Sequence, residues 1–217
     1  PLVACALLGG ACQKIDAGVD AGVDAGVDAG TARLWTPLPL RSAAQKIAGF
    51  AGGEGMQWIH SGSYAPSDPN IVYIAGDTNH VWRSDDSGAT WKSKRQGFKS
   101  NGAISLVVDP LNEDVVFVSG SHHGLSGAQT SPVDGIYRTT NGGDSWELVH
   151  VTPSYRALEG QHFAFDPQSF DGVRHRTIYA ATHTAGLLRS LDGGGSWASV
   201  LDASGAPVLA GTRITDL

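Results

Sequence analysis

The sequence predicts an all-β fold, and three observations predict it. A pattern of eight residues occurs three times, at 84–91, 139–146 and 190–197, and each copy ends in tryptophan. Runs rich in β-branched and aromatic residues, which are typical of strands, lie between the copies. Only 17% of the residues are charged and 29 are glycine, as many turns and short strands require. The three tryptophans are 55 and 51 residues apart. A period of this size indicates a propeller or a solenoid.

Each copy of the pattern has the composition of a β-hairpin turn. Ser or Thr comes first, Asp or Asn follows two residues later, Gly four residues later, and Ser or Thr directly precedes Trp. Asp and Asn side chains bond to the backbone of their own turn, and Gly reaches the positive φ that a tight turn needs. The Trp then opens a strand and fills the space beside it. The pattern resembles the Asp-box, or bacterial neuraminidase repeat, and we expect it to have a structural role.

Each repeat is expected to hold four short antiparallel strands, which together form one β-propeller blade. Three blades cover about residues 56–93, 103–150 and 161–200, and a fourth starts at 212–217. Since propellers have about four to eight blades, the ring is expected to be incomplete and the chain to be an N-terminal fragment. The expected strands are 58–64, 71–75, 80–84 and 90–93; 104–108, 115–119, 135–139 and 145–150; and 162–165, 177–181, 186–190 and 196–200. A turn is expected at 67–70.

The first 33 residues differ in composition from the rest. Residues 1–12 are apolar and small, like the tail of a secretory signal. The stretch is similar to a bacterial lipoprotein signal, and this resemblance implies a lipidated cysteine. Cys5 fits by the residues before it and Cys12 fits by position, and we prefer Cys12. Residues 16–30 repeat Asp-Ala-Gly-Val. Such a repeat cannot bury enough apolar surface to order itself, so we expect residues 13–33 to form a flexible tether. We therefore expect a secreted or cell-envelope protein, lipid-anchored at a bacterial surface.

Composition excludes several classes of function. The net charge is −6, and no basic patch for nucleic acid is present. No run of 18 apolar residues predicts a membrane-spanning helix, so contact with a membrane is expected only through the lipid anchor. The only two cysteines lie near the start, and a disulfide framework is therefore not expected.

Strand direction alternates within a blade, so the connections alternate between two faces. The first-to-second turns and the Asp-box turns share one face, which we call the Asp-box face. The second-to-third connections and the links between blades share the other, which we call the loop face. Ligands of propellers usually bind where the blades open near the central axis, and we expect the loop face to carry function.

The loop face gathers polar side chains from all three blades. Aligning the second strands on their aromatic residues Tyr73, Phe117 and Tyr179 places Asp77, Ser121 and His183 at one equivalent position, four residues further on. Polar groups that converge on a concave surface are the default hypothesis for a binding site, and solvated loops are the alternative. A metal site would need ligands at a suitable spacing, which the histidines lack, so no metal or cofactor is expected. Further candidates for substrate contact are His80, His122, His123, Tyr155, Arg156 and Glu159, with His162 beside them.

Parts of all three blades resemble glycoside hydrolase family 74, the endo-xyloglucanases and related β-glucan hydrolases. The resemblance covers about residues 56–200, and it implies a polysaccharide substrate and hydrolysis with inversion. At the position of Asp77 that family has a general base. In that family the acid is a second Asp from a second propeller, about 6.5–9.5 Å from the base. We expect it beyond Leu217, and Glu159 is the candidate within this chain by its predicted face alone. The neighbours of Asp77 depart from the family, with Ala-Gly before it instead of Arg-Thr. The similar segments are 72–77 with 82–83, 105–110 with 135–138, and 163–167 with 186–190.

Two other functions remain open. A sialidase would need an arginine cluster, but Arg83, Arg138 and Arg189 recur at one strand position beside each Asp-box turn, and such repetition favours a structural role. The second serious hypothesis is a propeller without catalysis that binds a glycan or a protein at the cell surface. An apposed second carboxylate and aromatic platforms for sugars would distinguish the hydrolase from it.

Overall fold

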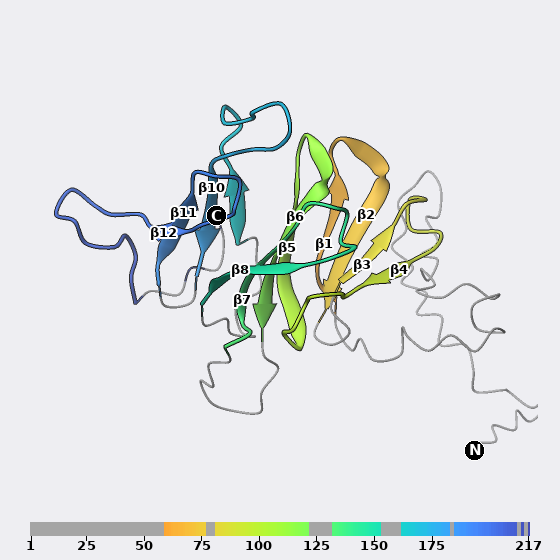
Figure 1. Cartoon of the computed structure of the whole chain (residues 1–217), viewed down its shortest axis with the longest axis horizontal. Helices are drawn as coiled ribbons and strands as arrows, with labels where there is room; N and C mark the ends of the chain where they lie inside the picture. The colour runs from red at the N-terminus through yellow and green to blue at the C-terminus, as the bar shows by residue number, and fades with distance from the viewer. Residues whose placement is uncertain are drawn as a thin grey trace, which may run out of the picture. The chain divides into compact units, whose positions relative to one another are not determined.

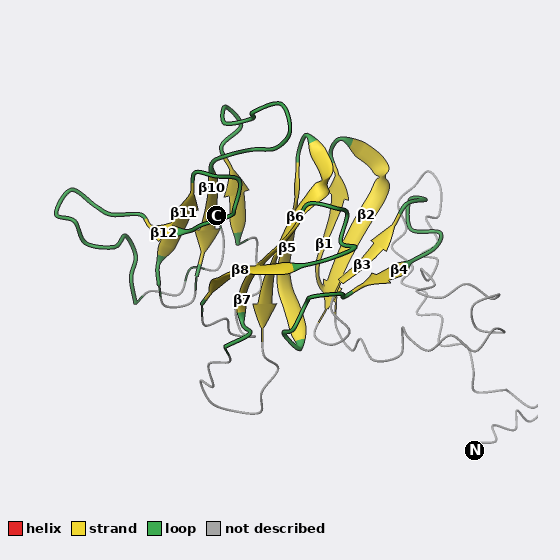
Figure 2. Ribbon diagram, in the orientation of Figure 1, coloured by secondary structure: helices red, strands yellow, loops and turns green. Residues whose placement is uncertain are grey.

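The computed structural model describes residues 59–76, 81–121, 132–152, 162–182 and 185–211, together with Ile214 and Leu217; of Ser121 only the backbone is described. Within these ranges the chain forms twelve strands and no helix, as Figures 1 and 2 show. The strands make three separate four-stranded antiparallel sheets. The all-β class and the four-stranded blades are therefore confirmed, and the three sheets do not close into a ring.

Each sheet takes its strands in chain order, so each is a simple meander. The innermost strand comes first in the chain and the outermost strand comes last. The first sheet contains β1 (Ile59–Ala65), β2 (Asp68–Gly76), β3 (Val81–Ser84) and β4 (Lys92–Lys94); the second contains β5 (Gly102–Asp109), β6 (Asn112–Ser121), β7 (Gly135–Thr139) and β8 (Glu147–Val151); the third contains β9 (Phe163–Phe165), β10 (Ile178–Ala181), β11 (Leu187–Ser190) and β12 (Ala198–Ser199).

The strand bounds differ from the expected ones by a few residues. The expected turn at 67–70 is wrong from Asp68 onward, because β2 already starts there. Ala65 pairs with Asp68, which leaves only residues 66–67 to turn the chain. Asp68 then accepts a hydrogen bond from the backbone N–H of Asn70 within the strand. The outermost strand of the third sheet is shorter than the expected 196–200, with two residues.

The three Asp-box turns are built alike. In each, the first hydroxyl accepts a hydrogen bond from the Gly four residues later, at 2.8–3.0 Å. The Asp or Asn side-chain oxygen accepts another from the backbone of the Ser or Thr before Trp. Two consecutive residues of each turn have positive φ, which explains the glycines. These pairs are Ser87–Gly88, Gly142–Gly143 and Gly193–Gly194. The structural role expected for the pattern is confirmed.

The sheets pack face to face along their inner strands, with β1 and β2 against β5, and β5 against β9. All eight residues of β5 are buried, because a sheet covers each of its faces. One apolar cluster fills the space between the first two sheets and a second cluster the space between the last two. Phe98, from the link between the first two blades, lies in the first cluster and stacks on Tyr137 with ring centroids 4.2 Å apart.

Candidate functional site

The connections divide between two faces as expected. Strand order and antiparallel pairing put the second-to-third connections of all three sheets at one end of the strands and the Asp-box turns at the other. The alignment of the second strands also holds. Three aromatic residues of the second strands pair with three arginines of the third strands: Tyr73 with Arg83, Phe117 with Arg138, and Tyr179 with Arg189. Sequence positions 77, 121 and 183 are therefore equivalent, at or just beyond the ends of β2, β6 and β10.

The predicted site residues lie almost wholly outside the described residues. Ser121 is the last residue of β6, so the backbone at this position is at the loop face. Asp77 directly follows the last residue of β2, Gly76, and His183 is two residues after Ala181, the last residue of β10. The others outside the described residues are Cys12, His80, His122, His123, Tyr155, Arg156 and Glu159. Their roles stay predictions.

Beneath the loop face, the inner strands carry a polar side chain at one equivalent position. Ser61 pairs with Ala75 and Ser105 pairs with Ser119, each directly after a register shift in its strand. His162 is the third member, because its carbonyl accepts a hydrogen bond from Ala181. Irregular strands of this kind are over-represented next to functional sites, where they re-aim side chains.

These polar residues connect neighbouring blades. The Ser61 hydroxyl accepts a hydrogen bond from the backbone N–H of Leu106, at 3.1 Å. The Ser105 hydroxyl accepts one from the backbone N–H of His162, at 3.0 Å, and the His162 Nδ1 lies 3.2 Å from the Ser119 hydroxyl. His162 is buried. It therefore fixes the second and third blades to each other below the loop face instead of projecting from that face.

A second buried contact anchors the longest loop of this face. The Ser100 hydroxyl donates a hydrogen bond to Asp134 Oδ1 at 2.8 Å, and both residues are fully buried. The carbonyl of Asp134 accepts another from the backbone of Thr152. No repeat in the sequence indicates Asp134, because the connection 122–134 has no counterpart of similar length in the other blades. The one sequence feature that marks its position is the glycine that follows it, Gly135, the first residue of β7.

The two faces differ in how uniform their connections are. All three Asp-box turns have seven residues between strands, at 85–91, 140–146 and 191–197. On the loop face the second-to-third connections have four, thirteen and five residues, at 77–80, 122–134 and 182–186. Uniform turns indicate a repeated structural unit, whereas variable loops on a rigid scaffold are where binding residues concentrate.

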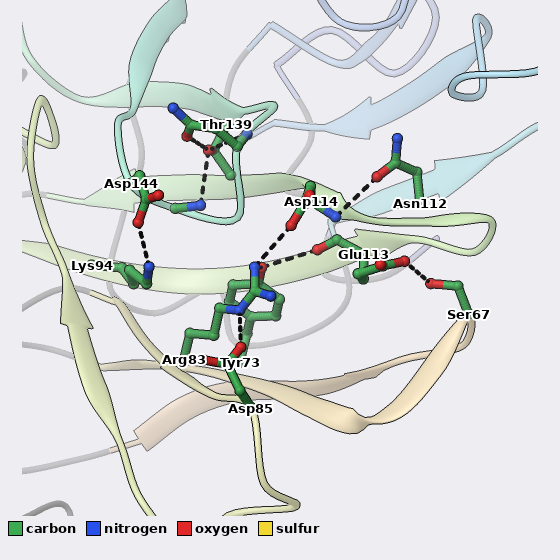
Figure 3. A network of polar contacts seen from close by, with 12 residues as sticks. Ser67, Tyr73, Arg83, Asp85, Lys94, Asn112, Glu113, Asp114, Thr139 and Asp144 are labelled. Carbon is green, nitrogen blue, oxygen red and sulfur yellow. Dashed lines mark hydrogen bonds and ion pairs between the residues drawn. The ribbon is translucent and has the colours of Figure 1, made fainter.

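The Asp-box face carries a network of polar contacts between the first two blades, drawn in Figure 3. Arg83 is its centre. The Arg83 Nη1 lies 3.0 Å from Asp114 Oδ1 in the second blade and donates to the Tyr73 hydroxyl at 2.8 Å. Its Nε contacts Asp85 at 2.6 Å. The Tyr73 hydroxyl in turn donates to the carbonyl of Glu113. The Arg83 guanidinium therefore has its hydrogen-bond and ion-pair partners within the protein.

Burial and charge shift the pKa values in this network. Burial raises the pKa of Tyr73, which stays a hydrogen-bond donor at every ordinary pH. Burial pushes the pKa of Asp85 upward, but hydrogen bonds from Lys92 and Arg83 outweigh it and hold the pKa below its usual value. Tyr73 therefore stays neutral and Asp85 stays charged at ordinary pH, which suits a structural contact better than proton transfer.

The second arginine makes an analogous contact with the third blade. Arg138 donates from Nη1 to the carbonyl of Gly193, in the third Asp-box turn, at 3.1 Å. Its Nη2 forms an ion pair with Glu147 at 3.0 Å. Arg83 and Arg138 therefore each bridge to the following blade and do not converge on a shared point. This supports the structural reading of the repeated arginines over a sialidase cluster.

No three His, Cys, Asp or Glu side chains of the described residues come together to hold a metal ion. No helix in the same ranges could cross a membrane.

Comparison with known proteins places the fold. Residues 79–207 match the family described as "Sortilin-Vps10: Sortilin, neurotensin receptor 3". The GH74 xyloglucanase from Xanthomonas campestris is 21% identical, with a TM-score of 0.50, over 70% of this chain and 24% of that one. An ancestral GH74 enzyme is 15% identical, with a TM-score of 0.51, over 68% and 19%. YCF48 from Cyanidioschyzon merolae is 18% identical, with a TM-score of 0.44, over 68% and 41%.

The two GH74 structures show the fold, a β-propeller, and nothing finer at such identities. No curated protein matches the chain. The chain spans about a quarter of the length of the xyloglucanase.

Proposed function

This chain belongs to the Sortilin-Vps10 family, and on that premise we propose that it is part of a recognition propeller whose loop face binds a polysaccharide. The family is described by the name of a receptor, and a receptor works by recognition. The observation that carries the proposal is the contrast between the faces. The Asp-box turns have one length and satisfy their own polar groups, whereas the loop-face connections differ in length from blade to blade.

The chemistry of the loop-face connections supports a ligand rich in hydroxyl groups. Asp77, His122, His123 and His183 fall in connections that follow equivalent strand ends. A carboxylate accepts hydrogen bonds from sugar hydroxyls, and an imidazole can both accept and donate them. Below them, the buried contacts of His162 and Asp134 hold the blades in place. A rigid base under polar loops is the arrangement that binding surfaces use.

Affinity electrophoresis of the full-length protein in gels that contain xyloglucan or mixed-linkage β-glucan tests the proposal. We expect Asp77→Ala and His183→Ala to weaken retardation by about tenfold or more, which corresponds to about 1.4 kcal/mol. Lys92→Ala is the matched control, because Lys92 is an exposed residue of β4 on the first blade's outer edge. The proposal would be contradicted if both polysaccharides retarded the unsubstituted protein and all variants equally. It would also be contradicted if Lys92→Ala lost as much retardation as Asp77→Ala.

Hydrolysis of the bound polysaccharide is the second candidate. It is favoured by the place of Asp77, the one carboxylate among the three residues at equivalent strand ends, and by the resemblance of segments 72–77 and 82–83 to family 74. Asp77 would act as the base that activates water, and a second carboxylate would protonate the leaving oxygen. Reducing-sugar release from xyloglucan that falls about 10²–10⁴-fold in Asp77→Ala would support hydrolysis. Binding without release by the unsubstituted protein would leave recognition alone.

A further inference from the structure

The first-to-second connection of the third sheet differs from its two counterparts. These connections lie on the Asp-box face and have two residues in the first and second sheets, at 66–67 and 110–111, but twelve in the third, at 166–177. We call 166–177 the third-blade loop, and in Figure 1 it is the large loop beside β10. Loops of variable length on a rigid scaffold are where binding residues concentrate, so this loop marks a second candidate surface.

The third-blade loop has internal structure and an anchor. Phe170 and His175 form an antiparallel bridge across it. The Asp171 carboxylate accepts hydrogen bonds from the backbone N–H groups of Val173 and Arg174 at the tip. A buried carboxylate of the second blade contacts the His175 ring. The tip therefore has a defined conformation before any ligand binds, and such preorganisation lowers the entropic cost of binding.

Apolar side chains are exposed at this tip and beside it. Val173 is 62% exposed, and Leu111, in the short turn of the second blade, is 56% exposed. The side-chain amide of Asn112 donates to the carbonyl of Val173 at 2.7 Å. This hydrogen bond places the tip beside the turn that carries Leu111, so the two apolar side chains lie on adjacent segments of one face.

The Arg174 side chain, next in the chain, lies against the third Asp-box turn. Its Nε occupies the space where a Cβ of Gly193 would be, and it is buried there without a hydrogen-bond acceptor. Within the described ranges, no residue forms an ion pair or a side-chain hydrogen bond with the Arg174 guanidinium. Its Nη atoms are not buried in this way, so they are open to a ligand.

The corresponding cation between the first two blades has counter-charges. There Arg83 lies beside the equivalent glycine of the second Asp-box turn, and its guanidinium contacts the carboxylates of Asp85 and Asp114. A partly buried guanidinium without an acceptor or a counter-charge costs free energy. The contrast favours an anionic partner for Arg174.

The acids of the two turns that meet at Arg174 already have partners. Asp171 caps the backbone of the tip and pairs with Arg176 at 3.5 Å. Asp192 accepts hydrogen bonds from the backbone within the third Asp-box turn. The counter-charge for Arg174 therefore has to come from a binding partner.

We propose that Leu111, Val173 and Arg174 form a docking site for an acidic peptide segment of a partner protein. A carboxylate of the partner accepts hydrogen bonds from the Nη atoms of Arg174, and an apolar side chain beside that carboxylate packs on Val173 and Leu111. A peptide is favoured over an acidic sugar, because an acidic sugar would use the cation but not the two aliphatic side chains. The site lies on the Asp-box face and leaves the loop face free for a polysaccharide.

A titration of the isotope-labelled full-length protein with a short peptide, followed by NMR, tests the inference. The probe is acetyl-Leu-Glu-Leu-amide, and acetyl-Leu-Gln-Leu-amide is its neutral counterpart. We expect a Kd of about 1 mM for the acidic peptide and an affinity about fivefold lower for the neutral one, as a surface ion pair allows. The amide signals that should move are those of 110–112, 171–176 and 191–195.

Variants test the roles of the individual side chains. Arg174→Gln should weaken binding of the acidic peptide about fivefold and Val173→Ser about threefold, whereas Arg174→Lys should keep most of the affinity. Arg95→Gln is the matched control, because it removes the same charge from an exposed residue of the link between the first two blades. It should leave the affinity unchanged.

The comparison of the two peptides on the unsubstituted protein does not depend on how well the variants fold. Equal affinity for the acidic and the neutral peptide, an equal loss in Arg95→Gln, or signal changes confined to the loop face would overturn the inference. Sodium glucuronate that moves the same signals and displaces the peptide would also overturn it, since Arg174 would then serve an acidic sugar.

Discussion

The carboxylate of Asp109 in the second blade holds both the ring and the backbone of His175 in the third. Its Oδ1 lies 2.8 Å from the His175 Nδ1, and its Oδ2 accepts the backbone N–H of His175 at 2.7 Å. The two side chains are 0% and 2% exposed. The rings of Phe165 and Phe170 flank the imidazole, with centroids 5.4 and 5.3 Å away. The pair is thus a dry contact that fixes one blade to the next.

Removal of this carboxylate should destabilise the protein strongly. Asp109→Ala leaves two buried donors of His175 without an acceptor, and we expect a loss of about 3 kcal/mol in the free energy of unfolding. Asp166→Ala is the matched control, because Asp166 caps its own Asp-Pro turn as Asp109 does, through a backbone N–H two residues on. It should cost about 1 kcal/mol. Urea unfolding measures both, and equal losses would show that only the turn caps matter.

Gly142 should tolerate no side chain. It has φ of 67°, and a Cβ there would lie 1.9 Å from the Arg83 Nη1 and 2.8 Å from Asp114 Oδ1. Gly142→Ala should therefore cost about 3 kcal/mol, through backbone strain and displacement of Arg83. Gly172→Ala separates the two effects, since Gly172 has φ of 95° but nothing within 4 Å of its Cβ position. It should cost only about 1 kcal/mol, and a similar loss for both substitutions would contradict the role given to Arg83.

The middle Asp-box turn should gain stability from an acid. Asn141 occupies the position that Asp86 and Asp192 hold in the other turns. Hydrogen bonds from Thr90 lower the pKa of Asp86. Burial pushes the pKa of Asp192 upward, but hydrogen bonds from Ser196 outweigh it and lower the pKa strongly. In Asn141→Asp we expect the same kind of shift, because the Ser145 backbone and the Thr139 hydroxyl already donate to Asn141.

The sign of the pH dependence follows from the direction of these shifts. A carboxyl whose folded pKa is lowered stabilises the fold above its unfolded pKa of about 4 and loses that contribution as the pH falls through the folded value. Asn141→Asp should therefore raise the thermal midpoint at pH 7 and lose the gain at about pH 2. Thermal unfolding followed by circular dichroism at both pH values tests this. A gain of the same size at both would show that charge is not its cause.

The sequence predicts the parts of the fold that local chemistry sets. The three Asp-box turns were found because their caps and glycines act within eight residues. Strand ends were less accurate, since the pairing of Ala65 with Asp68 depends on the partner strand. Contacts between blades could not be predicted, because Asp109 and His175 are 66 residues apart and meet only after two sheets have packed.

In the candidate site, too, the features that repeat from blade to blade could be predicted and the contacts between distant residues could not. The alignment on Tyr73, Phe117 and Tyr179 gave the right strand ends, because equivalent residues recur at each blade. The support below the loops was not foreseen. The Ser100–Asp134 contact joins a link between blades to the end of a long loop, and no repeat in the sequence indicates it.

The measurement that most directly tests the division between the two faces is hydrogen exchange of the full-length protein with and without a xyloglucan oligosaccharide. We predict slower amide exchange on the loop face alone when the oligosaccharide is bound. Protection in the Asp-box turns, with the loop face unchanged, would contradict the account. The segments to compare are 77–80, 122–134, 153–161 and 182–186 on the loop face, and 85–91, 140–146 and 191–197 on the Asp-box face.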